Sequence, residues 1–144
     1  DFTLLKNEHV LIDVEDEQIA LAGLDDAILG KPDYHLALEA IQPGLFTILL
    51  VHEPDLADQT KLFQVDIQLS GHSHGGQVRF PFIGHLYTPT YAEKYVQGKY
   101  VFSDHPLKLF VSRGVGTTRL PFRLLCKPEI NIYHLTNQPY TSMK

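Results

Sequence analysis

Three histidines follow short apolar segments of this chain and could together bind a metal ion. His52 comes directly after the apolar run at 46–51, and His72 and His74 follow the run at 65–69. Such runs are typical of buried parallel strands, and ligands gather at the carboxyl ends of such strands. Because neutral imidazole is a common ligand of transition metals, the three histidines predict a metal site at one edge of a sheet.

The segment at 71–77, Gly-His-Ser-His-Gly-Gly-Gln, is also rich in glycine. His72 and His74 are two residues apart, so an extended backbone would point both rings in one direction. Gly75 and Gly76 permit the left-handed backbone of a tight loop around an anion, and we expect them to contact phosphate. A lone histidine at the end of a strand is more often an ordinary polar residue. The metal interpretation therefore depends on the combination with His52.

Together these residues resemble the metallophosphoesterase (calcineurin-like phosphoesterase) superfamily, and within it a bacterial membrane-associated phosphodiesterase branch. In that branch a strand that ends in histidine is followed by Gly-His-Ser-His-Gly-Gly-Gln, as at 49–55 and 71–77 here. The segments 111–118 and 128–130 resemble the closing segment of the branch, so the similarity spans nearly the whole chain. The resemblance implies an α/β fold, namely the carboxyl-terminal half of a four-layer α/β/β/α sandwich with a mixed sheet.

The site of this family is built from five sequence blocks, and the first three are not found in this sequence. These blocks are Asp-x-His, Gly-Asp, and Gly-Asn-His followed by an acid. Asp33-Tyr34-His35 matches the first block by its letters, but it follows Pro32 and opens a helical pattern. We therefore expect 1–144 to be a single domain, the carboxyl-terminal portion of a phosphoesterase domain. It would hold none of the catalytic residues, and the general acid would lie outside it.

The resemblance implies a metal-dependent hydrolase of phosphodiester bonds, with phosphomonoester and lipid-linked bonds as alternatives. The reaction would be in-line attack by a hydroxide that bridges two divalent ions of Mn, Zn or Fe. By position, His52 and His72 would bind one ion and His74 its neighbour. Two close cations repel strongly unless carboxylates lie between them, so we expect at most one ion here and little or no turnover by this chain alone.

Two other classes of protein remain open. The chain could be a non-catalytic binding or assembly module that retains the histidine loop as a structural metal staple. It could also be one half of a split enzyme that another chain completes. The number of bound ions, and its dependence on a partner, distinguishes these hypotheses.

Two further residues are candidates for contact with the substrate. Arg113 stands at the end of a predicted strand at 107–112, where a guanidinium can clamp phosphate, although a surface ion pair is the commoner role. Asp25, in the Gly-Leu-Asp-Asp segment at 23–26, lies near the substrate cleft in the resembled branch. A turn or helix cap is an equally good interpretation of this aspartate.

The stretch at 78–89 contains two prolines and several aromatic residues, so it cannot be one regular element. Its aromatic side chains could simply belong to the core, where most aromatics lie. Alternatively, Phe80, Phe82, Ile83 and Leu86 form an exposed apolar rim for a lipid or a membrane surface. The resemblance favours this second interpretation, with a lipid-linked phosphodiester as the substrate.

The elements that would position these residues follow an α/β order. We first expect a meander of three strands, at 2–5, 9–13 and 19–24. Helices and strands then alternate, with helices at 31–41 and 54–63 and strands at 46–51 and 64–69. Further strands are expected at 107–112 and 129–135, and a frayed tail at 136–144. This order predicts a layered sheet with right-handed crossovers.

Composition sets broader limits on the partners. The 144 residues are 44% hydrophobic, which suffices for one buried core, and the formal charge of -5 gives no basic footprint for nucleic acid. The single cysteine, Cys126, excludes an internal disulfide. An open sheet edge could pair with a second copy, so a homodimer is one expectation. The resemblance favours a bacterial cytoplasmic or membrane-associated location.

Overall fold

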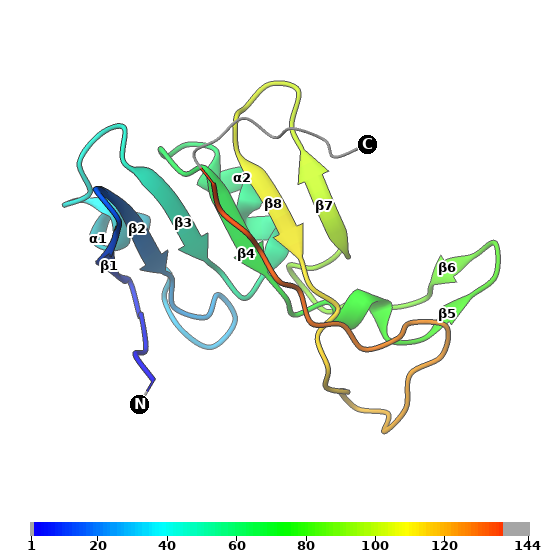
Figure 1. Cartoon of the computed structure of the whole chain (residues 1–144). Helices are drawn as coiled ribbons and strands as arrows, with labels where there is room; N and C mark the ends of the chain where they lie inside the picture. The colour runs from blue at the N-terminus through cyan, green and yellow to red at the C-terminus, as the bar shows by residue number, and fades with distance from the viewer. Residues whose placement is uncertain (1, 137–144) are drawn as a thin grey trace, which may run out of the picture.

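A mixed sheet of six strands organises residues 2–136, the part of the chain that the computed structural model describes (Figure 1). The strands lie in the order β1 (Glu8–Val14), β2 (Glu17–Gly23), β3 (Phe46–Leu50), β4 (Ile67–Ser70), β8 (Lys108–Val111) and β7 (Gly98–Val101). The four central strands are parallel, whereas β1 and β7 run antiparallel at the two edges. The predicted α/β class and mixed sheet are confirmed.

The helical segments α1 (Tyr34–Leu38), η1 (Pro54–Leu56) and α2 (Ala57–Thr60) pack together on one face of this sheet (Figure 1). The carboxylate of Asp33 accepts a hydrogen bond from the amide of Leu36 at 3.0 Å and so caps α1. The hydroxyl of Tyr34 is within 3.0 Å of the Leu56 carbonyl, and its ring stacks on Phe63. Asp33-Tyr34-His35 therefore opens a helix, as predicted, and anchors it.

The core lies between the sheet and these helices. Leu49 of β3 and Leu109 of β8 are fully buried, and they meet Ala37 of α1 and Ala57 of α2. Side chains alternate between the two faces of a strand, so every second residue of β3 and β8 contributes to this core. The apolar runs recognised in the sequence are the strands that supply it.

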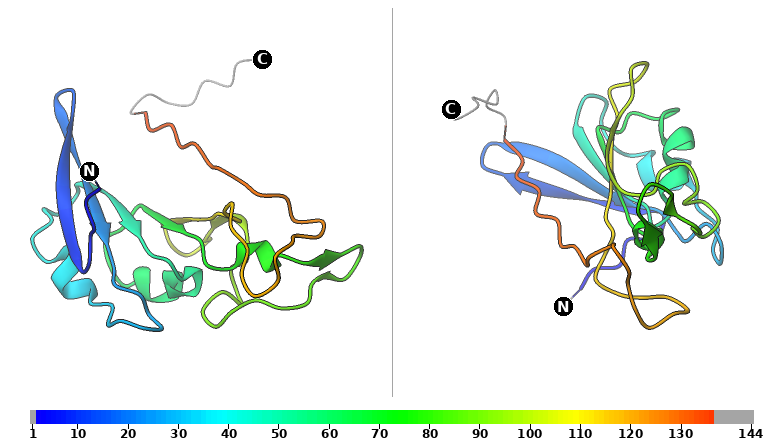
Figure 2. Two further views of the ribbon diagram at one scale, coloured as in Figure 1. Left: turned by 90° about the horizontal axis from the view of Figure 1, so that it is seen from below. Right: turned by 90° about the vertical axis from the view of Figure 1, so that its right-hand side faces the viewer.

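The opposite face of the sheet is also apolar but only half covered. The strand register places Leu50 of β3 beside Leu69 of β4 and Phe110 of β8. Leu50 remains 36% exposed, and the other two are half-buried. The extended segment after β8 crosses part of this face (Figure 2), where the ring of Tyr133 meets that of Phe110 edge-on. We call this surface the open face.

Several elements differ from the prediction. Residues 2–5 form no strand, although β1 lies at the edge of the sheet; Leu5 instead packs closely against Gly23 at the end of β2. Residues 129–135 are extended but belong to no strand; the amide of Glu129 instead bonds to the carbonyl of Gly114. The edge strand β7 was not predicted, since its four residues Gly-Lys-Tyr-Val carry no apolar run. The helices are also shorter than their patterns suggested.

The proline-containing stretch after the histidines forms a small separate hairpin of β5 (Arg79–Phe80) and β6 (Gly84–His85), which projects from the body (Figure 1). Its irregularity was predicted. The interpretation of its aromatics as core is wrong for Phe82, which is fully exposed at the turn, where its φ of 66° lies in the left-handed region. In residues 2–136 we find no helix with the length and apolar character needed to cross a membrane.

Candidate metal centre

His52, His72 and His74 line one cavity of about 610 Å³ beyond the carboxyl ends of β3 and β4. The ring centroids of His52 and His72 are 4.7 Å apart. A charge on His74 contributes to lowering the pKa of His52, after burial and His72. The structure thus brings the three predicted residues together, and their role as metal ligands stays a prediction.

Backbone pairing continues beyond β3 and β4 and explains why these loops leave the sheet side by side. The amide of Val51 bonds to the carbonyl of Leu69 at 3.1 Å, and the amide of Gly71 bonds to the carbonyl of His52 at 3.1 Å. The parallel register therefore extends as far as the first histidine. His52 and His72 consequently emerge from adjacent chains at the same edge of the sheet.

The loop itself is not extended, contrary to the expectation from the His-x-His spacing. His72 and His74 have φ values of 62° and 51°, and the short helix η2 (His74–Gly76) begins at the second histidine. Left-handed backbone at residues other than glycine costs of order 1–3 kcal/mol each and persists where surrounding contacts impose it. The rings therefore converge through strained backbone and tertiary contacts.

Two of the three glycines of the loop, Gly75 and Gly76, are needed for close packing. A Cβ atom on Gly76 would lie 2.2 Å from the Cβ of His85, and one on Gly75 would lie 2.8 Å from the Sγ of Cys126. Both residues also have positive φ. These contacts explain why glycine is needed at both positions. Their contact with phosphate stays a prediction.

A hydrogen bond to a backbone carbonyl fixes which ring nitrogen of His72 is available for a metal. Nε2 of His72 lies 3.0 Å from the carbonyl of Thr90, and Nδ1 of His74 lies 3.2 Å from the carbonyl of Gly116. A carbonyl only accepts, so Nε2 of His72 carries the proton and the lone pair remains on its Nδ1, an arrangement typical of metal-binding histidines. Nδ1 of His74 also lies 3.4 Å from Nη2 of Arg123, which only donates, so this nitrogen faces both an acceptor and a donor.

Two carboxylates that were given no metal-site role lie beside His52. Desolvation and the neighbouring His72 lower the pKa of His52, which favours the neutral ring that a metal requires. Glu53 is fully buried, and neither of its carboxylate oxygens has a hydrogen-bond partner within residues 2–136. The amide of Leu29 lowers the pKa of Asp26, with smaller contributions from the amide of Ile28 and from His52. No local sequence pattern identifies Glu53 as a candidate ligand. Its complete burial in the structure does, because a glutamate side chain is normally exposed.

The donor set fits a transition-metal ion but not a complete binuclear centre. Imidazole nitrogens with free lone pairs and a buried carboxylate without a partner are suitable ligands. Across the described part of the chain, however, no three His, Cys, Asp or Glu side chains are grouped so that they could hold one ion as they stand. Further donors are needed to close the site.

Arg113 and Asp25, the two charged residues predicted to contact the substrate, are both paired with other groups of the protein. Arg113 donates from Nε to the carboxylate of Glu129 at 2.8 Å. The carboxylate of Asp25 accepts the amide of Lys31 at 2.9 Å and pairs with the ammonium group of Lys6 at 3.3 Å. These contacts match the ion-pair and turn interpretations. The substrate roles of Arg113 and Asp25 stay predictions.

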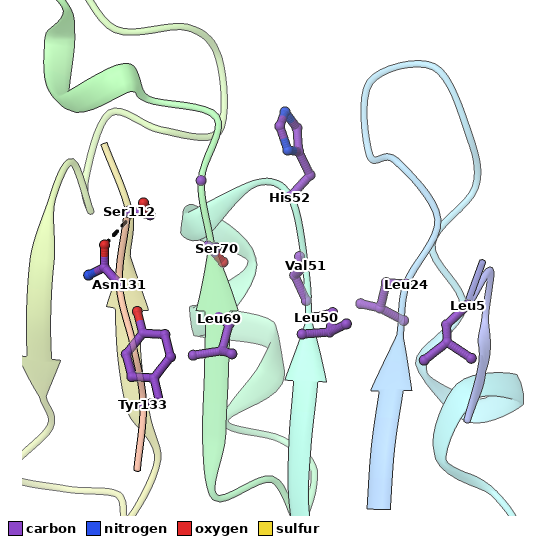
Figure 3. A pocket seen from close by; sticks show the side chains of 11 residues that line it. Leu5, Leu24, Leu50, Val51, His52, Leu69, Ser70, Ser112, Asn131 and Tyr133 are labelled. Atoms are coloured by element: carbon purple, nitrogen blue, oxygen red, sulfur yellow. Dashed lines mark hydrogen bonds between the residues drawn. The ribbon is translucent and has the colours of Figure 1, made fainter. Parts of the chain in front are cut away.

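A second cavity, of about 460 Å³, lies on the open face next to the histidines (Figure 3). Leu50 and Leu69 line it from the sheet, and Asn131 lines it from the extended segment. Asn131 also lies 3.3 Å from the hydroxyl of Ser112. His52 lines both cavities and therefore stands where the open face meets the candidate metal centre.

Comparisons with known proteins support the motif-based resemblance. The chain is 46% identical to YkuE, a metallophosphoesterase of Bacillus subtilis, over 93% of its own length and 46% of that protein. It is 33% identical to the phosphodiesterase YaeI of Escherichia coli, over 92% of the chain and 47% of that protein. It is 29% identical to the UDP-2,3-diacylglucosamine pyrophosphatase LpxG of Chlamydia muridarum, over 96% of the chain and 43% of that protein. No family model and no solved structure matches it.

The chain is thus related by sequence to the metallophosphoesterase superfamily over nearly its whole length, as its motifs predicted. It spans about half the length of these relatives.

Proposed function

We propose that this chain is part of a metal-dependent phosphodiesterase in which His52, His72 and His74 hold divalent cations. The observation that carries this proposal is the convergence of three imidazoles at one cavity, with one nitrogen of His72 left free by a carbonyl hydrogen bond. A divalent cation bound there supplies Lewis-acid polarisation of the phosphoryl oxygen and neutralises charge that develops during hydrolysis. Mn, Zn and Fe all suit this donor set.

The chain's own residues position the ligands. Arg123 donates from Nη1 to the carbonyl of His74 at 3.0 Å and from Nη2 to the carbonyl of Gly116 at 2.6 Å. The same Gly116 carbonyl lies 3.2 Å from Nδ1 of His74, and Nη2 of Arg123 lies 3.4 Å from that nitrogen. Arg123 therefore ties the backbone of this histidine to the loop that orients its ring, and it acts as a positioning residue.

The remaining donors, we propose, come from polypeptide that stacks on the open face. Residues 2–136 supply a sheet with helices on one face, which corresponds to two layers of the expected four-layer sandwich. The relatives are about twice as long as this chain, and the open face offers apolar side chains for a further layer. Carboxylates from such a layer would lie beside His52 and balance the charge of two cations.

The function is tested with a chimera of YaeI in which the aligned segment is replaced by this chain. With Mn²⁺, the folded chimera should hydrolyse a chromogenic phosphodiester, and His72→Ala should lower kcat/KM at least about 100-fold. His35→Ala, which changes an exposed imidazole outside the cavity, is the matched control. The isolated chain should show little or no turnover. A folded but inactive chimera, or full activity after His72→Ala, would contradict the proposal.

The second candidate is a non-catalytic module that keeps the loop as a structural metal staple. The buried, unpartnered carboxylate of Glu53 favours it, because such a group can join a structural site. Metal analysis separates the two functions. A single tightly held ion in both the isolated chain and the chimera indicates a staple, whereas a second ion that appears only in the chimera indicates the enzyme.

For the substrate, we propose a lipid-linked phosphodiester. One relative, LpxG, is named as the pyrophosphatase of a diacylated sugar nucleotide. The apolar side chains of Leu86, Leu120 and Phe122 line the same cavity as the three histidines, which supports an apolar substituent next to the phosphate.

A further inference from the structure

Two segments far apart in sequence are fastened together beside the histidine cavity. The side-chain amide nitrogen of Gln77 lies within 3.0 Å of the carbonyls of Thr118, Leu120 and Phe122. Its side-chain oxygen accepts the amide of Thr118 at 2.7 Å. Gln77 is itself buried, so it anchors the loop at 115–125 to the start of the β5–β6 hairpin.

These two segments, residues 78–89 and 115–125, form one surface that we call the apolar rim. Six of its large side chains are exposed: Phe82 108%, Ile83 70%, Leu86 67%, Leu125 65%, Leu120 50% and Phe122 50%. Leu86, Leu120 and Phe122 also line the cavity of the histidines. The rim therefore borders the candidate metal centre through three of its apolar side chains.

The charge of this region is opposite to that of the whole chain. The apolar rim and the three residues that follow it, 126–128, contain Arg79, Arg119, Arg123 and Lys127 and no aspartate or glutamate, whereas the chain carries a formal charge of -5. Arg119 and Lys127 are exposed, and the guanidinium of Arg119 lies 5.1 Å from the centre of the Tyr87 ring. Exposed apolar side chains flanked by cations without acids complement a surface that is apolar inside and anionic outside.

We infer that the apolar rim docks on the surface of an anionic lipid bilayer. Phe82 and Ile83 at the hairpin tip insert among the acyl chains, and Arg119 and Lys127 lie at the level of the lipid phosphates. The cavity then opens next to the bilayer, where a lipid phosphodiester reaches the histidines. This last step rests on the proposed function, whereas the docking itself does not.

Vesicle flotation of the 144-residue chain tests the docking without metal or substrate. The chain should float with vesicles of phosphatidylcholine containing about one third phosphatidylglycerol and much less with phosphatidylcholine alone. The double variant Phe82→Ser, Ile83→Ser should bind at least about 10-fold more weakly, since two exposed apolar side chains no longer insert. Arg119→Gln should weaken binding to the anionic vesicles by about fivefold.

The matched control is Leu29→Ser, Leu62→Ser, which removes two apolar side chains that are 90% and 81% exposed elsewhere on the molecule. This variant should float like the unchanged chain, and circular dichroism should show all variants folded. Equal flotation of the rim variant would overturn the inference. So would equal binding to neutral vesicles, or a dimer in solution that the rim substitutions abolish, because a second copy would then be the occupant.

The outcomes separate this inference from the proposed function. If vesicles capture the chain through the rim but the YaeI chimera hydrolyses no phosphodiester, the docking stands and the enzymatic proposal fails. If the chimera hydrolyses a water-soluble diester while flotation does not depend on the rim, the enzymatic proposal stands and the docking fails.

Discussion

The two faces of the central sheet differ in what covers them. Leu49 and Leu109 lie in the same strands as Leu50 and Phe110, one residue apart, yet the first pair is fully buried and the second is not. The helical segments account for this difference, because they pack on one face only. A parallel sheet that is apolar on both faces is suited to burial on both. The covered face holds the fold together, and the open face is available for a further layer.

The candidate metal centre lies at the end of the open face. His52 lines both the cavity on that face and the cavity of the three histidines. A layer that covered Leu50 and Leu69 would therefore come to lie beside His52. This position explains how the histidines can be well placed on the sheet while the donor set remains incomplete.

The largest expected effect is a loss of stability on truncating a leucine of the covered face, compared with the same change on the open face. Leu109→Ala, on the covered face, should lower the free energy of unfolding by about 2–5 kcal/mol, because it leaves a cavity in the core. Leu50→Ala, on the open face, should cost less than about 1 kcal/mol, because its side chain is already partly hydrated. Urea unfolding followed by circular dichroism measures both. Equal losses would break the comparison and show that the open face is buried in solution.

Alkaline pH should weaken the covered face through Tyr34. Burial raises the pKa of this tyrosine from 10.0 to about 12. A raised pKa in the folded state means that the neutral phenol stabilises the fold fully below pH 10, and that this contribution disappears as the pH rises to 12. The expected loss is about 2–3 kcal/mol.

Urea unfolding at several pH values between 9 and 12 checks this prediction. Tyr34→Phe is the matched variant, since it keeps the ring but cannot ionise. Its stability should fall less steeply over the same range. If the two proteins follow the same curve, the phenol is hydrated and the helices pack more loosely than the structure indicates.

A smaller effect is expected at the start of α1. Asp33→Ala removes the side-chain cap and should cost about 1 kcal/mol. Thermal unfolding of this variant and of Asp33→Asn, which retains an acceptor, measures the loss. The asparagine variant should recover most of the stability. An alanine variant as stable as the original would show that the cap contributes nothing and that packing alone holds α1.

The sequence predicted those features that local patterns determine. The apolar runs before His52 and His72 identified β3 and β4, and Asp33 after Pro32 marked the start of a helix. The exposed rim was one of two interpretations of the stretch at 78–89, because periodicity does not reveal which aromatics find partners.

Long-range contacts determine what could not be predicted. The rings of His72 and His74 are oriented by carbonyls 18 and 42 residues away, so the spacing of the two histidines wrongly suggested an extended loop. Gln77 bonds to a loop more than 40 residues further along the chain, and its role has no local signal. The buried carboxylate of Glu53 likewise depends on how the chain folds around it.

Calorimetric titration of the isolated chain with Zn²⁺ and Mn²⁺ tests most directly whether His52, His72 and His74 share one rim. We predict about one bound ion per chain. His72→Ala should weaken the affinity at least about 10-fold, and His35→Ala should leave it unchanged. Unaltered affinity after His72→Ala, or two tightly bound ions on this chain alone, would contradict the account.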